Sequence, residues 1–305
     1  MFIADAHCDT LFEIGTKMRA AADCAITAER MKLGGMGLQV FAMFAGSKGC
    51  AGTPYLFGRQ MLDVVDKLGV PVYTHRLPDA PPSFPAGVLA IEGGEMLEGN
   101  MERLYEFYNE GGIRMISLTW NNENEIGHPA KHGSKEGLKP FGLKLLGEMD
   151  RLGIYADVSH LNEAGFWDIV NHMNLPPVAS HSNAYELCNH PRNLKDDQIR
   201  AIIEKKGYIG INFYSDFLAR GREAVLEDVF RHIDYIAQMG GIDVLGFGSD
   251  FDGIDEWPEG LAHPADYPNL IALLRSHGYA ERDIEAIAGG NLWRVLKSAD
   301  ALRGE

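Results

Sequence analysis

Residues 141–180 read FGLKLLGEMDRLGIYADVSHLNEAGFWDIVNHMNLPPVAS, and this stretch determines the predicted fold. Two amphipathic segments, Phe141–Leu152 and Glu163–His172, alternate with two short apolar runs, Tyr155–Ser159 and Val178–Ser180. The longer segments carry the helical spacing of apolar residues, and the short runs have the length and character of buried strands. Strands that alternate with helices predict a parallel sheet in which each helix connects one strand to the next.

The same alternation extends in both directions along the chain. Helical patterns also occur at Met101–Asn109, Asp196–Lys205 and Ala224–Met239. The strand-like runs are Phe2–Ala6, Leu38–Phe44, Val88–Ile91, Met115–Thr119, Tyr155–Ser159, Val178–Ser180, Tyr208–Asn212 and Val244–Gly248. Eight such units within roughly 250 residues match the size of a (β/α)8 TIM-type barrel. An open, doubly wound sheet is the rival fold, but the sequence has neither GxGxxG after the first run nor GxxxxGK[ST].

Composition favours one globular domain over residues 1–305. Hydrophobic residues make up 46% of the chain and charged residues 23%, which is enough for a substantial core. The net charge of −15 argues against nucleic-acid and membrane partners, because phosphate backbones and anionic lipids repel it. The N-terminal sequence MFIADAHCDT lacks the basic start and apolar core of a signal peptide, so we expect a cytoplasmic protein.

The cysteines give no sign of a structural cross-link. Cys8, Cys24, Cys50 and Cys188 are irregularly spaced and form no CxxC pair. The sequence therefore predicts neither a disulfide framework nor a cysteine-rich zinc site.

Side chains of the types that bind metals follow five of the predicted strands. They are His7 and Asp9 after the first strand, Glu92 after the third, His160 after the fifth, His181 after the sixth and Asp250 after the eighth. The C-terminal ends of barrel strands converge on one face, where the active sites of such barrels lie. A second His-x-Asp, at His232, falls in a helical pattern, where residues two apart point in different directions. The convergence of six side chains, rather than any one of them, predicts a metal site.

The composition of this set indicates which metals it would bind. Three imidazoles and several carboxylates suit Zn²⁺, with Mn²⁺ or Co²⁺ as substitutes. Six groups exceed the needs of one tetrahedral ion, so we expect two ions per chain. Glu92, with two carboxylate oxygens, is the natural bridge between them, because the fourth strand ends in Leu118-Thr119-Trp120 and offers no lysine for that role.

Several motifs resemble those of the renal (membrane) dipeptidase family and occur in the same order. They are HCD at residues 7–9, EGG at 92–94, SH at 159–160, ASHSNA at 179–184, NHPRNL at 189–194, GSDFDG at 248–253 and GGNLWRV at 289–295. The similarity extends from about residue 3 to residue 296. It implies an amidohydrolase-like barrel and a binuclear zinc peptidase that cleaves dipeptides, including those with a C-terminal D-residue. It also suggests a homodimer.

The resemblance assigns roles to individual residues. It makes His7, Asp9, Glu92, His160 and His181 the metal ligands. Asp250 matches the acid/base group of the family, and Arg192 matches the arginine that grips the carboxylate of the substrate. One position departs from the family, because a strand-four histidine that helps to hold the substrate is replaced by Trp120 in LTWN. His128 and His132 follow in a loop, for which we expect exposure to solvent.

Three other interpretations stay open. Another hydrolase of the amidohydrolase type, such as a deaminase or lactonase, would share the ligands but would not need Arg192. An inactive metal-binding homologue would lack an acid/base group, whereas Asp250 is present. A metal-free barrel enzyme such as an aldolase would carry a catalytic lysine at a strand end, and no predicted strand ends in one.

Overall fold

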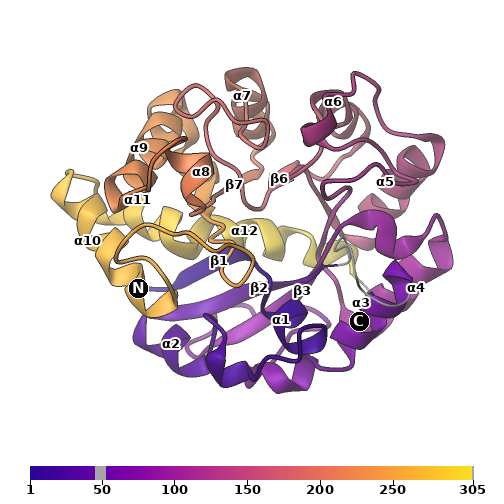
Figure 1. Cartoon of the computed structure of the whole chain (residues 1–305), viewed down its shortest axis with the longest axis horizontal. Helices are drawn as coiled ribbons and strands as arrows, with labels where there is room; N and C mark the ends of the chain where they lie inside the picture. Colours follow the sequence, from indigo (N-terminus) through magenta and orange to yellow (C-terminus); the bar gives the residue numbers. More distant parts are fainter. Residues whose placement is uncertain (45–52, 304–305) are drawn as a thin grey trace.

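The eight strands form a closed parallel barrel whose order around the ring, β1 to β8, follows the sequence (Figure 1). The computed structural model describes residues 1–44 and 53–303. The strands are β1 (Ile3–Cys8), β2 (Met36–Phe44), β3 (Ala86–Glu92), β4 (Met115–Ser117), β5 (Tyr155–Asp157), β6 (Val178–Ala179), β7 (Tyr208–Ile211) and β8 (Leu245–Phe247). The predicted (β/α)8 barrel is therefore confirmed.

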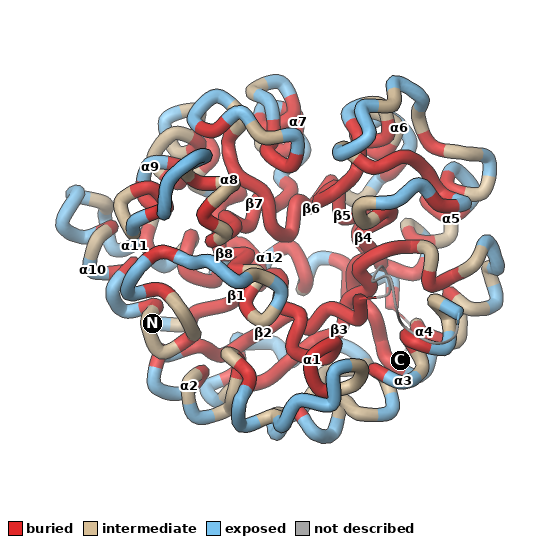
Figure 2. Tube along the Cα trace, in the orientation of Figure 1, coloured by how far each residue is buried: buried red, intermediate tan, exposed pale blue. Residues whose placement is uncertain are grey.

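Helices surround the barrel and lie mainly on its outside (Figures 1 and 2). They are α1 (Thr10–Gly15), α2 (Ala28–Leu33), α3 (Pro54–Leu62), α4 (Met101–Gly111), α5 (Pro140–Leu152), α6 (Glu163–His172), α7 (Asp196–Lys205), α8 (Ser215–Leu218), α9 (Leu226–Ile236), α10 (Tyr267–Ser276), α11 (Glu281–Glu285) and α12 (Asn291–Ser298). Figure 2 shows the strands almost entirely buried and the outer turns of the helices exposed. Strands buried on both faces explain why the sequence shows continuous apolar runs.

The helix α12 closes one end of the barrel interior. Its buried Leu292, Val295 and Leu296 pack in one cluster with barrel residues such as Ala4 and Val88. The Tyr155 hydroxyl also donates to the Val295 carbonyl oxygen at 2.5 Å. Buried polar side chains such as His7 and Glu92 lie instead at the C-terminal ends of the strands.

The strand register places those polar ends side by side. Phe44 of β2 pairs with Glu92 of β3, and Glu92 pairs with Ser117 of β4. Ser117 in turn pairs with Asp157 of β5. This register brings the C-terminal ends of four neighbouring strands to a common level.

Element boundaries differ from the predictions by a few residues. β1 extends to Cys8, so His7 lies within the strand rather than after it. The helical pattern Ala224–Met239 becomes α9 followed by a π-helical turn at Ala237–Gly241, where Gly240 has a φ of 91°. One domain over residues 1–305 stays a prediction, since residues 45–52 and 304–305 lie outside the described part of the chain.

The described residues also bear on the cysteines and on membrane-spanning helices. Cys8, Cys24 and Cys188 are buried and form no disulfide with one another, whereas Cys50 lies outside the described residues. Across residues 1–44 and 53–303, no helix combines the length and the apolar character needed to cross a membrane.

Candidate metal centre

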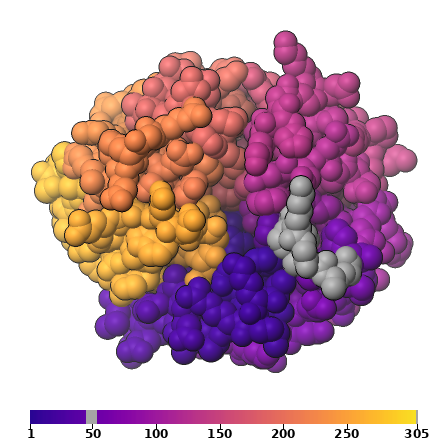
Figure 3. Space-filling model, in the orientation of Figure 1, coloured from indigo at the N-terminus to yellow at the C-terminus, as the bar shows by residue number. Residues whose placement is uncertain are grey.

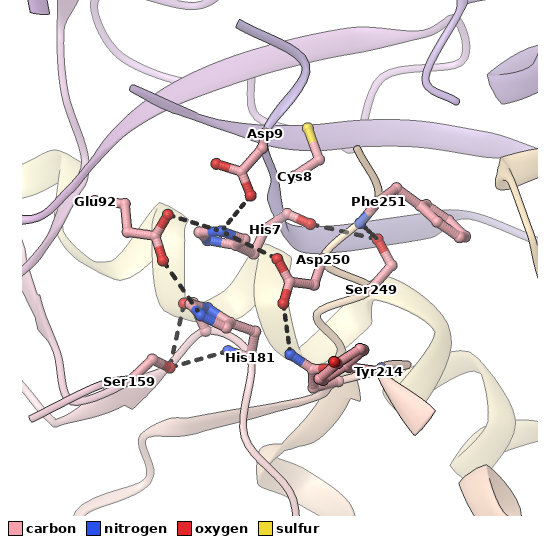
Figure 4. A network of polar contacts seen from close by, with 12 residues as sticks. His7, Cys8, Asp9, Glu92, Ser159, His181, Tyr214, Ser249, Asp250 and Phe251 are labelled. Atoms are coloured by element: carbon pink, nitrogen blue, oxygen red, sulfur yellow. Dashed lines mark hydrogen bonds and ion pairs between the residues drawn. The ribbon is translucent and has the colours of Figure 1, made fainter. Parts of the chain in front are cut away.

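The predicted ligands from β1 and β3 meet at the C-terminal end of the barrel (Figure 4). His7 Nε2 lies 3.5 Å from an Asp9 carboxylate oxygen and 3.6 Å from Glu92 Oε2. It also lies 3.8 Å from Asp250 Oδ1. These side chains point toward one another, whereas the Cys8 thiol points away from them. His7, Asp9 and Asp250, from the ends of the first and eighth strands, therefore form one group of potential ligands around one oxygen of Glu92.

The histidines from β5 and β6 form a second group on the other side of Glu92. His160 Nε2 lies 3.0 Å from Glu92 Oε1, and His181 Nε2 lies 3.5 Å from the same oxygen. The two Nε2 atoms are 3.0 Å apart. Glu92 thus directs Oε2 to the first group and Oε1 to the second, as a bridging carboxylate would.

Buried polar atoms without partners test whether a cation fits here. His7 Nε2 and Asp9 Oδ1 are buried and have no hydrogen-bond partner among the described residues. A buried polar group without a partner is costly, so an ion at this position would satisfy both atoms. Two subsets place ligand atoms within 4.8 Å of one another, namely His7 with Glu92 and His181, and His7 with Asp9 and Asp250. The residues fit a metal centre.

The pKa values of the buried carboxylates and of two histidines also favour binding of a metal cation. Burial, reinforced by the charge of Glu92, raises the pKa of Asp9 to about 8. Burial likewise raises the pKa of Asp250. Burial together with the nearby charge of Arg192 lowers the pKa of His160 to about 4, and burial lowers the pKa of His181. His160 and His181 are therefore neutral imidazoles near neutral pH, the form that binds metals.

His7 behaves differently from the other two histidines. Burial lowers its pKa, but the charge of Glu92 and the contacts with Asp9 and Glu92 outweigh burial and raise it well above its ordinary value. The carboxylates thus attract a positive charge to the position beside His7 Nε2. A metal ion would supply that charge and displace the proton, because ligating imidazoles are neutral.

Neighbouring polar groups orient the ligands. Asn121 Oδ1 lies 3.1 Å from His160 Nδ1, and Ser180 Oγ lies 2.7 Å from His181 Nδ1. Each contact engages Nδ1 and leaves Nε2 facing Glu92, an arrangement that recurs around metal-binding histidines. Asp157 fixes Ser180 in turn, since its carboxylate accepts from the Ser180 hydroxyl at 2.6 Å.

The backbone at two site residues adopts an unusual conformation. His160 has a φ of 70° and Asp250 a φ of 66°, both in the left-handed region. Such conformations cost about 1–3 kcal/mol for non-glycine residues and concentrate at functional sites. The Asp250 amide donates to the His7 carbonyl at 3.2 Å, and the Asp9 amide donates to the Phe251 carbonyl at 2.9 Å. These bonds join the ends of β1 and β8.

Arg192 lies beside the centre and is buried, although it comes from the loop after β6. Its Nη2 donates to the His181 carbonyl at 3.4 Å, whereas its Nε has no partner in the described part of the chain. Burial lowers its pKa to about 10, so the guanidinium stays charged near neutral pH. Its central carbon lies 5.5 Å from the centre of the Phe217 ring. A buried cation with free donor capacity can bind a carboxylate in two-pronged geometry.

The central cleft has a volume of about 910 Å³ and reaches Asp9, Glu92, His160 and Asp250. Trp120 forms part of its wall and makes an edge-to-face contact with Phe44 at 4.9 Å between ring centres. Figure 3 shows the surface hollowed where the N-terminal, middle and C-terminal segments meet. The strand-four position thus presents an aromatic surface to the cleft rather than an imidazole.

The loop histidines do not join the centre. His132 is exposed, as expected, but His128 is buried, and the expectation that it is exposed to solvent is wrong. Its ring nitrogens lie 3.5 Å from Glu123 and 3.6 Å from Glu136, and its carbonyl accepts from the Asn162 amide at 3.0 Å, so this loop packs against the segment after β5. His232, from the second His-x-Asp, lies in α9 and is also outside the centre. Its Nδ1 accepts from the Ala184 amide at 3.1 Å.

Sequence reasoning missed two asparagines of the site. Asn212 Nδ2 donates to Asp250 Oδ2 at 2.9 Å and directly follows β7. The strand-end rule that identified the histidines would have found it. Asn121 follows Trp120 in LTWN, but only the folded loop brings it to His160.

Comparison with known proteins adds a family assignment to this geometry. The chain matches the family described as membrane dipeptidase (peptidase family M19) over residues 85–305, a range that includes Glu92, His160, His181, Arg192 and Asp250. It is 40% identical over 223 residues to an uncharacterised Klebsiella pneumoniae protein, covering 70% of this chain and 82% of that protein. It is 35% identical over 218 residues to the Aspergillus oryzae dipeptidase aclJ, covering 69% of this chain and 51% of that protein. The chain thus spans about half the length of that relative.

Solved structures extend the similarity to the N-terminal strands. A dipeptidase described as a metallo peptidase of family M19 superposes with a TM-score of 0.88 at 27% identity and covers 98% of both chains. A Rhodobacter sphaeroides metallo peptidase, solved with a phosphinate mimic of the dipeptide L-Ala-D-Ala, gives a TM-score of 0.87 at 26% identity. That alignment covers 97% of this chain and 99% of the other. The present chain belongs to the membrane dipeptidase family, peptidase family M19.

Proposed function

We propose that the protein is a zinc-dependent dipeptidase that holds two metal ions and hydrolyses the peptide bond of dipeptides. The observation that carries the proposal is the position of Glu92, which directs one carboxylate oxygen to each of two groups of buried ligands. Membership of the membrane dipeptidase family supports the same activity. The mimic of L-Ala-D-Ala bound by the Rhodobacter relative supports dipeptides with a C-terminal D-residue.

The metal ligands in this proposal are His7, Asp9, Glu92, His160 and His181. Zinc suits their nitrogen and oxygen donors, with Mn²⁺ or Co²⁺ as substitutes. When bound, the ions would supply Lewis acidity, which lowers the pKa of bound water to about 7 and polarises a carbonyl. The homodimer and the cytoplasmic location expected from the sequence remain predictions.

Asp250 would carry the proton during hydrolysis. Its Oδ2 accepts from Asn212, which leaves Oδ1 directed toward the centre of the site. In this position Oδ1 would accept a proton from the attacking water and deliver it to the leaving amine. Asn212 holds the carboxylate in place while the proton moves.

Arg192 and Trp120 would bind the substrate. The buried guanidinium of Arg192, whose Nε has no partner among the described residues, would hold the C-terminal carboxylate of the dipeptide. Trp120 would pack against the substrate from the wall of the cleft. A binuclear deaminase or lactonase would have no need for a buried arginine that binds a carboxylate. Arg192 therefore favours a dipeptidase over these two alternatives.

The test combines a change in the enzyme with a change in the substrate. Zinc-loaded wild-type protein and Arg192→Ala are assayed on L,L- and L,D-dipeptides and on the same dipeptides with an amidated C-terminus. The variant should lose about 2–5 kcal/mol in kcat/KM on the free dipeptide, the range for breaking a buried charge pair. Amidation should cost the wild type nearly as much, and the two changes together should add little, because they remove the same contact.

Two results would overturn the proposal. Absence of hydrolysis of every dipeptide would exclude the activity. Full additivity of the two changes would mean that Arg192 does not meet the carboxylate, and a generic binuclear hydrolase would then describe the protein better. Arg192→Lys is the matched control and should restore only part of the loss, since an ammonium group lacks the two-pronged geometry.

A further inference from the structure

A groove leads away from the centre between the helices α6 and α7. It has a volume of about 570 Å³, and its walls come from the loops after β4, β5 and β6 and from the first turns of the two helices. Figure 3 shows a recessed seam between the segments coloured magenta and salmon, which contain α6 and α7 respectively. The groove is separate from the central cleft over most of its length, because the two share few lining residues.

The groove and the central cleft meet at His160 and Arg192. His160 lines both spaces. Arg192 lines the groove, and its guanidinium lies 5.5 Å from the ring centre of Phe217, which lines the cleft. Arg192 is 6% exposed and its Nε has no partner among the described residues. A buried, incompletely paired cation thus stands where the two spaces join.

Apolar and aromatic side chains line one part of the groove, beside polar and charged ones such as Lys135, Asn162 and Gln198. Leu161 and Leu194 are buried in it, and the aromatic rings of Trp167 and Tyr185 are half-buried along it. The charged pair Lys195 and Glu163 lines it too, but these side chains bond to each other at 2.7 Å. The apolar part of this surface, formed by Leu161, Leu194 and the two aromatic rings, favours an apolar or aromatic group.

We propose that this groove binds the side chain of the C-terminal residue of the dipeptide and selects large apolar or aromatic side chains. The inference rests on the proposed function, in which Arg192 holds the C-terminal carboxylate. The carboxylate and the side chain of that residue leave the same Cα atom. A carboxylate bound at the junction therefore places the side chain within a few bonds of the groove, whose volume readily holds one aromatic side chain.

Isomeric dipeptides test the proposal, because they differ only in where the bulky side chain lies. Gly-L-Phe and Gly-D-Phe are assayed separately, because inversion at Cα redirects the side chain. The configuration that is hydrolysed faster would place its ring in the groove, whereas Phe-Gly would place it elsewhere. Ala164 lies in the first turn of α6 and lines the groove, so Ala164→Phe fills part of it and Ala164→Leu fills less. Asn171→Phe adds the same ring at an exposed position of the same helix, outside the groove, and serves as the control.

The measurement is the ratio of kcat/KM for Gly-Phe to that for Phe-Gly. Ala164→Phe should lower this ratio by about tenfold or more, since one well-filled apolar pocket discriminates by roughly 10–200-fold. Ala164→Leu should lower it by a smaller factor, and Asn171→Phe should leave it at the wild-type value. Circular dichroism confirms that each variant is folded.

The possible failures are distinguishable. If the wild type hydrolyses neither isomer nor Gly-Gly, the proposed function is wrong. If it hydrolyses them but both Ala164 variants keep the wild-type ratio, or Asn171→Phe lowers it equally, the groove does not receive the C-terminal side chain.

Discussion

At the scale of single residues, Glu92 connects the two halves of the site. Its two oxygens face donor groups that come from opposite sides of the barrel, His7 from β1 and the pair His160 and His181 from the loops after β5 and β6. A glutamine at this position would keep the shape but offer only one carbonyl oxygen and no charge. A two-metal arrangement would therefore depend on the carboxylate of Glu92.

Replacement of Asp250 tests the proton-transfer role. Asp250→Asn keeps the side-chain shape and an oxygen for Asn212 but removes the base, so kcat should fall by about 10²–10⁴. Metal content, measured on the same preparation, should stay at the wild-type value. Loss of an ion together with activity would instead make Asp250 a ligand, and a near-normal kcat would assign proton transfer to another group.

At the scale of elements, the strands were predictable because they are buried on both faces. Continuous apolar runs such as Leu38–Phe44 identify such strands without any tertiary information, and their ends then identify the ligand types. Other features depend on contacts between distant segments. His128 is buried where its loop packs against the segment after β5, since the Asn162 amide donates to the His128 carbonyl at 3.0 Å, and the contact of Asn121 with His160 requires the same two segments to meet. No local pattern carries that information.

Close approach of β6, β7 and β8 also depends on glycine. A Cβ atom at Gly248 would lie 1.8 Å from the Ser180 carbonyl oxygen, and one at Gly210 would lie 2.1 Å from it. Because Ser180 precedes His181, any shift that relieves this overlap also moves a predicted ligand. The two glycines thus let the backbone position His181.

Gly248→Ala should therefore lower the free energy of unfolding by about 1–3 kcal/mol, the usual cost of overpacking. It should also weaken zinc binding, which titration calorimetry measures. Gly147→Ala is the control, because a Cβ at this position in α5 would meet nothing within 4 Å. That variant should gain about 0.5–1 kcal/mol from helix propensity. Equal stability of the two variants would contradict the close-approach explanation.

At the scale of the whole molecule, one buried histidine away from the site makes stability depend on pH. Burial lowers the pKa of His232 from 6.5 to about 4. The unfolded chain then binds more protons than the folded one between these pH values, so the stability from His232 is complete above pH 6.5 and is lost as the pH falls toward 4. At pH 5 the free energy of unfolding should be about 2 kcal/mol lower than at pH 7 because of His232.

Urea unfolding of the metal-free protein at pH 7 and pH 5 measures this loss. His232→Gln removes the titrating group, so its stability should change less between the two pH values, by about 2 kcal/mol relative to the wild type. An identical pH dependence for both proteins would show that His232 does not titrate in this range. Excess chelator in all samples keeps metal binding from contributing.

We expect the C-terminal end of the barrel to hold two metal ions, both required for dipeptide hydrolysis. Titration of metal-free protein with zinc, followed by elemental analysis and dipeptide hydrolysis in the same samples, tests it most directly. We predict that binding and activity both saturate at two ions per chain, and that circular dichroism of the metal-free protein retains most of the fold, because the barrel has its own apolar core. Saturation at one tightly bound ion, or full occupancy of two sites without hydrolysis of any dipeptide, would contradict the account.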